Sequence, residues 1–190
     1  MVYFVRKQIP NIITISRIVV IPFFVAAFFI ADEKLLNITV ATLFLIAGFS
    51  DYFDGYFARK WNVQSQVGKF LDPIADKLLV LAALIMLIYI GRADVIAALI
   101  ILIREITVSG LREFLGQNNV TLPVSELAKW KTAIQMLAIM ILIIGPEFGS
   151  HSNTLLIGNS GLWIAAALTW ITGYTYLKSG LNVILKPQEK

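Results

Sequence analysis

The sequence predicts an all-α integral membrane protein: six transmembrane helices in one bundle, preceded by a short N-terminal interfacial segment. Hydrophobic residues make up 58% of the 190 residues and charged residues only 15%, whereas about a quarter of the residues in a soluble domain are charged. The apolar residues gather in runs of roughly 20, the length that a helix needs to cross the hydrocarbon core of a bilayer. A chain of this length is expected to form a single domain, residues 1–190.

Six apolar runs define the expected helices, and polar or glycine-containing stretches separate them. The fifth run is the shortest and can borrow residues from Ser125 onward. Ahead of the first run, the aromatic and basic residues of 1–11 suit the headgroup region of a bilayer. The expected spans are Ile12–Ala31, Leu36–Phe57, Gly68–Ile90, Asp94–Leu115, Trp130–Gly145 and Leu155–Leu177.

The distribution of basic residues predicts the orientation of these spans. If the N-terminus is cytoplasmic, only Lys34 and Arg92 of the 16 Lys and Arg residues fall in loops on the outer side. An excess of basic residues marks the cytoplasmic side of a membrane protein. Six spans then return the C-terminus to the cytoplasm as well. We attribute the net charge of +4 to this bias and not to nucleic-acid binding.

Two missing or rare residue types exclude several kinds of chemistry. The chain has no cysteine, which excludes disulfides, thiolate catalysis and zinc–thiolate sites. It has one histidine, His151, so a metal site built from several histidines is excluded too. We expect His151 to lie in a loop on the outer side, within residues 149–158.

Four aspartates stand out because they occur in segments that otherwise look membrane-spanning: Asp51, Asp54, Asp72 and Asp76. A carboxylate in such a segment is costly, and it persists where it has a partner or a function. Spacings of three and four residues place each pair on one face of its helix. Because the second and third spans run in opposite directions, we expect the two pairs to meet at a similar depth near the cytoplasmic side.

These carboxylates need a countercharge, because four at one place cannot all stay ionised unaided. Mg²⁺ or Mn²⁺, which prefer oxygen ligands, would supply it, and the site is rich enough for two ions. Arg59 adds a planar cation suited to a diphosphate. Small residues, Gly55, Ala58 and Gly68, stand where a bulky ligand needs close backbone approach. The alternative is a set of interfacial ion pairs between the aspartates and Arg59, Lys60, Lys69 and Lys77.

The same residues resemble the signature of the CDP-alcohol phosphotransferase family, D-x2-D-G-x2-A-R-x8-G-x3-D-x3-D. The chain fills all its fixed positions between Asp51 and Asp76. Residues 10–17 are similar to the family's P-N-x-x-T-x-x-R element. Residues 104–113 and 129–132 are similar to the bacterial members that use glycerol 3-phosphate. The resemblance therefore covers nearly the whole chain.

The resemblance implies transfer of a phosphatidyl group from a CDP-linked donor to an alcohol, with release of CMP. It implies two bound Mg or Mn ions, and it makes Asp76 the general base as well as a metal ligand. The implied metal ligands are Asp51, Asp54, Asp72 and Asp76. The implied contacts to the CDP moiety are Gly55, Ala58, Arg59 and Gly68.

For the subgroup that it resembles, the implied donor is CDP-diacylglycerol and the implied acceptor is sn-glycerol 3-phosphate. The resemblance also implies a homodimer in the bacterial inner membrane, with both termini and the active site on the cytoplasmic side. Family members with other acceptors are the nearest alternative: cardiolipin, phosphatidylserine or phosphatidylinositol-phosphate synthases. A more remote alternative is a divalent-cation transporter, because acidic residues in spans also mark ion pathways. The outer halves of the spans are almost wholly apolar, which disfavours the transporter.

A second set of charged residues suits an anionic acceptor, which requires a basic pocket. Arg104 lies near the middle of the fourth span, where an unpaired cation would be costly. The candidates for the acceptor phosphate are Arg112, Lys129, Lys131 and, next to them, Arg104. The alternative is that Lys129 and Lys131 are ordinary cytoplasmic anchors and that Arg104 pairs with Glu105 or an aspartate.

Overall fold

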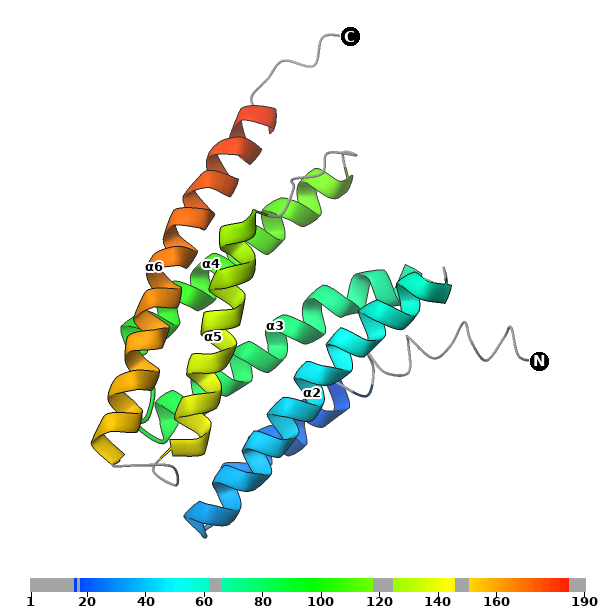
Figure 1. Ribbon diagram of the computed structural model, residues 1–190. Coiled ribbons are helices and arrows are strands. Elements are labelled where there is room, and N and C mark those ends of the chain that lie inside the picture. Colours follow the sequence, from blue (N-terminus) through cyan, green and yellow to red (C-terminus); the bar gives the residue numbers. More distant parts are fainter. Residues whose placement is uncertain (1–15, 17, 62–65, 118–124, 146–150, 185–190) are drawn as a thin grey trace, which may run out of the picture. The chain divides into compact units, whose positions relative to one another are not determined.

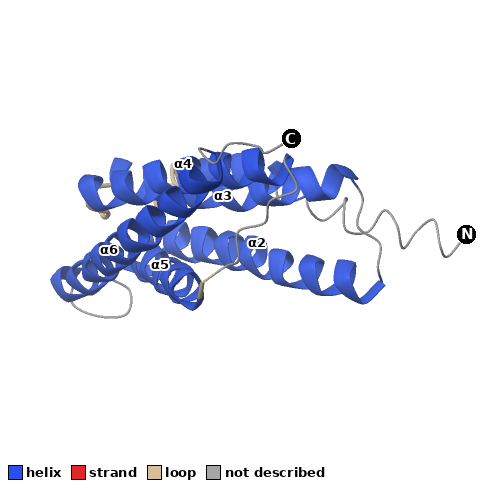
Figure 2. Cartoon of the chain, turned by 90° about the horizontal axis from the view of Figure 1, so that it is seen from above, coloured by secondary structure: helices blue, strands red, loops and turns tan. Residues whose placement is uncertain are grey.

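The computed structural model describes residues 16, 18–61, 66–117, 125–145 and 151–184. Within these, the side chains of residues 51–73, 76, 151–152 and 183–184 lie outside the description, as does the predicted N-terminal interfacial segment. Every regular element of the described part is a helix (Figure 2), which confirms the all-α class. The labelled helices (Figure 1) are α2 (Glu33–Trp61), α3 (Gln66–Tyr89), α4 (Val95–Gln117), α5 (Glu126–Ile144) and α6 (His151–Ile184), and a helix over Ile18–Ala27 precedes them.

Three of the described helical segments are long and apolar enough to cross a membrane: Glu33–Ser50, Glu126–Ile144 and Asn153–Asn182. The helices α3 and α4 have 24 and 23 residues, a sufficient length, but charged residues interrupt their apolar runs. Large apolar side chains lie exposed along the helices; Trp170, for example, is 68% exposed. Such a surface suits lipid, so the described helices fit a membrane protein, while the bundle of six spans stays a prediction.

The observed helix ends differ from the expected spans in two places. The first helix ends at Ala27 and not at Ala31, and α2 already begins at Glu33 because Asp32 caps it. The Asp32 carboxylate accepts a hydrogen bond from the backbone N–H of Leu35 at 2.7 Å, the arrangement typical of an N-cap. His151 is the first residue of α6 and does not lie in a loop, so that prediction was wrong. The extra turns make α6 34 residues long.

The chain divides into two compact units. One comprises Met1–Ile90 with Ile143–Phe148, and the other comprises Gly91–Leu142 with Gly149–Lys190. In the first unit, α2 and α3 contact each other, and the aromatic rings of Phe24 and Phe28 pack edge to face with their centroids 5.3 Å apart. The prediction of a single domain is not decided by this division.

Glycines on α6 allow its neighbours in the second unit to approach closely. A Cβ atom at Gly161 would lie 2.9 Å from the Cβ of Ala138 on α5, and one at Gly180 would lie 2.7 Å from the side chain of Leu111 on α4. In a membrane there is no hydrophobic driving force between helices, so their association depends on close packing. Small residues at such contacts let the helix backbones approach closely and gain packing energy. The glycines therefore bring α4 and α5 against one long helix.

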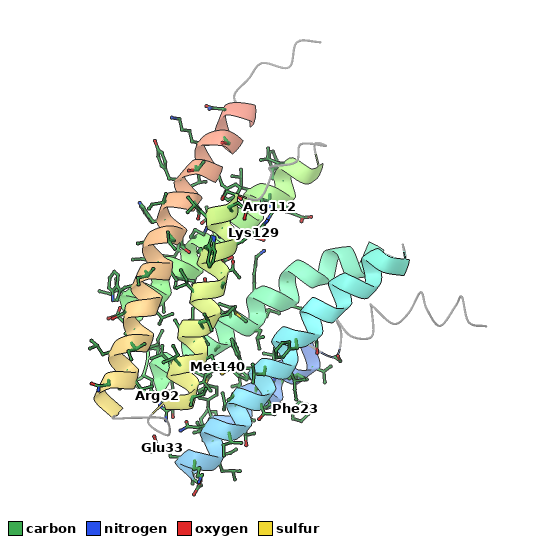
Figure 3. The ribbon with its side chains drawn as sticks, in the orientation of Figure 1. Phe23, Glu33, Arg92, Arg112, Lys129 and Met140 are labelled. Carbon is green, nitrogen blue, oxygen red and sulfur yellow. The ribbon has the colours of Figure 1, made fainter. Side chains whose placement is uncertain are left out.

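A group of hydrogen bonds connects the helices at the end of this unit where α4 begins, the end marked by Arg92 in Figure 3. The Asn159 amide donates to the backbone carbonyl of Arg92 at 2.9 Å and accepts from the backbone N–H of Asp94 at 2.7 Å. Arg92 is buried, and its guanidinium donates to the carbonyl of Leu142 on α5 at 3.3 Å. Arg92, expected only as a loop residue, thus ties three segments together.

Replacing Gly161 with alanine is expected to destabilise the protein by about 1–3 kcal/mol, because the added methyl group overlaps Ala138 in a packed interior. Gly110→Ala on α4 is the matched control, since a Cβ there meets nothing within 4 Å and alanine favours the helix by up to about 1 kcal/mol. Thermal unfolding in detergent should lower the midpoint for the first variant only. Equal midpoints would contradict the close α5–α6 contact.

Candidate active site

The two aspartate pairs lie on the neighbouring helices of the first unit. Asp51 and Asp54 are on α2, and Asp72 and Asp76 are on α3. The two helices contact each other and run in opposite directions (Figure 1). Because α2 and α3 are consecutive and antiparallel, both aspartate pairs lie toward the end of the helices where the chain passes from α2 to α3.

The two aspartates farthest from the connection between α2 and α3, Asp51 and Asp76, lie at equal distances from it along their helices. Asp51 lies ten residues before Trp61, the last residue of α2 (61 − 51), and Asp76 lies ten residues after Gln66, the first residue of α3 (76 − 66). At 1.5 Å per residue, each is about 15 Å along its helix from the connection. Four carboxylates at such positions are a donor set that fits hard divalent cations. The four side chains lie outside the described residues, so the metal site stays a prediction.

The predicted contacts to the CDP moiety fall on the same two helices. Gly55, Ala58 and Arg59 are in the last two turns of α2, and Gly68 is in the first turn of α3. Their side chains are outside the described part as well. These residues therefore lie close to the aspartates along the same two helices, and their contacts to the CDP moiety stay predictions.

The second candidate set is described with its side chains and contains a buried charged cluster. One oxygen of Glu105 on α4 accepts hydrogen bonds from the ammonium group of Lys131 on α5 and, at 3.3 Å, from the guanidinium of Arg104. The side chains are 2% exposed for Lys131, 11% for Arg104 and 20% for Glu105. We call these three residues the cation cluster. Arg104 thus pairs with Glu105, as the alternative to an acceptor pocket supposed, whereas the burial of Lys131 shows that this lysine is not a surface anchor.

Helix α6 fixes the guanidinium group of Arg104 from the other side. One of its nitrogens donates to the hydroxyl of Thr172 at 3.1 Å. The same group lies over the ring of Tyr176, 5.8 Å from its centroid, within the range of a cation–π contact. Gly173 leaves room for the side chain, because a Cβ there would lie 3.0 Å from the Cγ of Arg104. The position of Arg104 thus depends on three residues of α6.

Further polar atoms around the cation cluster are buried without a hydrogen-bond partner among the described residues. They are Nε of Arg104, Oε1 of Gln135 and Oγ1 of Thr169. Gln135 follows Lys131 by one turn of α5, and Thr169 precedes Thr172 by one turn of α6. Buried polar groups that have no partner are costly, so these atoms call for water or a polar ligand. The interior of this unit is therefore chemically suited to bind one.

The other two candidates for the acceptor phosphate lie on the surface. Figure 3 shows Arg112 and Lys129 toward the end of the unit where α4 ends and α5 begins. Arg112 is exposed, and Lys129 is 63% exposed and pairs with Glu126 at 2.7 Å. The structure thus brings Lys131 and Arg104 together in the interior, and leaves Arg112 and Lys129 outside the cation cluster.

Sequence reasoning missed the contribution of α6 to this site. Thr169, Thr172 and Tyr176 recur at spacings of three and four within an apolar helix, and that periodicity was the available signal. It was not used, because threonine and tyrosine are common in membrane helices, where they bond to their own backbone or lie near the interface. Thr172 does bond to the carbonyl of Leu168 at 2.9 Å, in addition to its contact with Arg104.

The fold and these two sets of residues fit a helical membrane protein whose second unit contains buried charged and polar side chains. The model of the CDP-alcohol phosphatidyltransferase family matches residues 7–172. The chain belongs to this family. The match extends over both compact units and includes the aspartates and the cation cluster.

Bacterial relatives are similar to this chain over most of their length. A protein of Rickettsia felis is 49% identical over 175 residues, 92% of this chain and 96% of the relative. A protein of Haemophilus influenzae is 44% identical over 185 residues, 95% and 97% of the two chains. A protein of Cereibacter sphaeroides is 37% identical over 211 aligned positions, 92% and 96% of the two chains. Each is named a CDP-diacylglycerol–glycerol-3-phosphate 3-phosphatidyltransferase.

Proposed function

We propose that this protein transfers the phosphatidyl group of CDP-diacylglycerol to sn-glycerol 3-phosphate, forming phosphatidylglycerophosphate and releasing CMP. Membership of the CDP-alcohol phosphatidyltransferase family supports the reaction type. The names of relatives at 37–49% identity support this donor and this acceptor. The hydroxyl group of the acceptor attacks the lipid-side phosphorus of the donor, and the bond to CMP breaks.

The observation that carries the choice of acceptor is the cation cluster. Lys131 and Arg104 hold two positive charges in an apolar helical unit, where the carboxylate of Glu105 pairs with both of them. Placing charges there is costly, and a neutral acceptor such as serine gives no reason for it. A phosphate group offers several acceptor oxygens and a negative charge that complements these two cations. Arg112 and Lys129 would attract the phosphate at the surface before it reaches the cluster.

On the donor side, Asp51, Asp54, Asp72 and Asp76 are proposed to hold two Mg or Mn ions. When bound, these ions would neutralise charge on the diphosphate and on the departing CMP. Asp76 is proposed to take the proton from the acceptor hydroxyl, which becomes more nucleophilic as the proton leaves. The CDP moiety would contact Arg59 and the small residues Gly55, Ala58 and Gly68, where the backbone can come close to it.

The cell location and the assembly are proposed on the same grounds. The excess of Lys and Arg in the segments assigned to the inner side supports cytoplasmic termini and a cytoplasmic active site. The bacterial relatives and the apolar helices support the inner membrane. The family resemblance supports a homodimer.

The decisive experiment measures CMP release by the purified protein in detergent with CDP-diacylglycerol. Glycerol 3-phosphate, serine, inositol phosphate and phosphatidylglycerol are compared as acceptors. We expect release with glycerol 3-phosphate alone, its loss with EDTA, and its recovery with excess Mg²⁺ or Mn²⁺. Release with another acceptor and none with glycerol 3-phosphate would contradict the acceptor. Full activity in EDTA would contradict the metal ions.

A further inference from the structure

We propose that Thr172 on α6 is a positioning residue for the acceptor: its hydroxyl orients the guanidinium group of Arg104 so that this cation can receive the phosphate of glycerol 3-phosphate. Gly173, the next residue, leaves the room that this orientation requires. The inference rests on the proposed function, since the phosphate belongs to the acceptor of that reaction. Thr172 and Gly173 act through Arg104 and are assigned no contact with the phosphate themselves.

The hydroxyl of Thr172 is suited to hold a cation because its own proton is engaged by the helix. It donates to the carbonyl of Leu168 at 2.9 Å, and the carbonyl of Thr169 lies 3.2 Å away as a second acceptor. A hydroxyl has one proton and two lone pairs, so the oxygen is left to accept from Arg104, whose guanidinium donates to it at 3.1 Å. Thr172 is only 3% exposed, which keeps water from competing for this bond.

Two helices hold the two terminal nitrogens of the guanidinium group. Nη2 of Arg104 donates to Thr172 on α6, and Nη1 donates to Glu105 on α4 at 3.3 Å. The group also lies over the ring of Tyr176, whose hydroxyl accepts from the backbone N–H of Ser125 at 3.1 Å. A planar group that is held at both terminal nitrogens and along one face has little freedom to rotate. Such a cation loses less conformational entropy when it binds an anion.

The stem of Arg104 passes close to the backbone of α6 at Gly173. A Cβ atom there would lie 3.0 Å from Cγ of Arg104 and 3.7 Å from its Nε. A contact of 3.0 Å requires the neighbouring atom to move by a few tenths of an ångström, and the far end of this side chain is tied to Thr172 and Glu105. An alanine at this position would therefore displace the guanidinium group or strain its hydrogen bonds.

Thr172→Val tests the proposal, because valine keeps the branched shape of threonine and removes the hydroxyl. We expect the KM for glycerol 3-phosphate to rise about 3- to 10-fold, as for the loss of one hydrogen bond, with the KM for CDP-diacylglycerol changed less than about twofold. Thr172→Ser retains the hydroxyl and should stay within about twofold of the wild-type KM. Thr175→Val is the matched control, since Thr175 is exposed on the same helix and bonds to the carbonyl of Ile171; its KM should be that of the wild type.

A double variant tests whether Thr172 acts through Arg104. Arg104→Met removes the guanidinium group and fills much of its buried volume with an uncharged side chain, while Lys131 remains for the phosphate. In this background Thr172→Val should raise the KM for glycerol 3-phosphate by less than about twofold more, because the group that it orients is gone. Effects of the two substitutions that multiply would overturn the proposal.

Gly173→Ala tests the role of the gap independently. The KM for glycerol 3-phosphate should again rise about 3- to 10-fold, because the displaced guanidinium loses a hydrogen bond. Gly110→Ala, whose added Cβ meets nothing within 4 Å, should leave this KM unchanged. The pair separates the displacement of Arg104 from the helix-favouring effect of alanine, which both variants share. A normal KM in Gly173→Ala would contradict the role assigned to the gap.

The remaining outcomes separate this inference from the proposed function. A normal KM in Thr172→Val, or a Thr172→Ser variant as impaired as Thr172→Val, would overturn the positioning role of the hydroxyl. Equal increases in the KM values of both substrates would assign Thr172 a general packing role and overturn it too. If the wild-type protein releases no CMP with glycerol 3-phosphate, the proposed function itself is wrong. A wild-type protein that uses glycerol 3-phosphate, together with a Thr172→Val variant of normal KM, contradicts only this inference.

Discussion

Asp76→Asn is expected to lower turnover by at least about 10²- to 10⁴-fold, the usual contribution of a general base. Asparagine retains the size of the side chain but can neither take a proton from the acceptor hydroxyl nor give a full charge to a metal ion. Three other aspartates on α2 and α3 remain to hold metal and the diphosphate. Binding of CDP-diacylglycerol should therefore stay measurable, for instance by titration calorimetry in detergent, while CMP release is lost.

The control is the same substitution at Asp94, which caps α4. Its carboxylate accepts a hydrogen bond from the backbone N–H of Ala97 at 2.9 Å. Asparagine is about as good an N-cap as aspartate, so Asp94→Asn should retain wild-type turnover and stability. Wild-type turnover in Asp76→Asn would remove Asp76 as the base. Loss of donor binding together with turnover would make it a metal ligand without a separate role in proton transfer.

Lys131→Ala is expected to raise the KM for glycerol 3-phosphate about 10- to 100-fold, because a hydrogen bond to a charged group contributes about 1.5–3 kcal/mol. The carboxylate of Glu105 loses its partner on α5 and adds repulsion toward the phosphate. The KM for CDP-diacylglycerol should change little. Steady-state kinetics with each substrate varied in turn would measure both values.

Two companion variants separate the charge of Lys131 from its packing. Lys131→Met fills most of the same buried volume without charge, and it should show a similar rise in KM. Lys129→Ala removes a lysine two residues away that is 63% exposed and paired with Glu126, and because an interaction of an exposed charge contributes about 0.2–1 kcal/mol, the KM should rise less than about fivefold. Equal increases for both substrates in Lys131→Ala would argue against an acceptor pocket.

Helix positions were largely predictable, and their ends less so. Each apolar run of the described part became a helix, because a helix satisfies the backbone hydrogen bonds of such a run within the run itself. The ends depended on caps: Asp32 brought the start of α2 forward, and Ser125 caps α5 through the backbone N–H of Ala128. His151 was expected in a loop because its surroundings are polar and rich in glycine, but such residues only weakly oppose the continuation of a helix.

For the cation cluster, the sequence alone could not predict which lysine of α5 is buried. Lys129 and Lys131 are two residues apart, so on a helix they point in nearly opposite directions, about 200° apart. From the sequence, both lysines were candidates for binding the acceptor phosphate, and nothing in the sequence indicated which one faces inward. Packing of α5 against α6 through Ala138 and Gly161 decided this, and it buried Lys131 while Lys129 stayed at the surface.

By itself the sequence determined the class of the protein and the chemistry of its most informative segment, because hydropathy and charge spacing are properties of the chain. The eight positions from Asp51 to Asp76 pointed to the family before any contact was known, and the family match agrees with them. Only the tertiary structure decided which charges meet. Glu105, Lys131 and Thr172 come from three helices, and the rotation of each helix about its axis is set by packing against its neighbours.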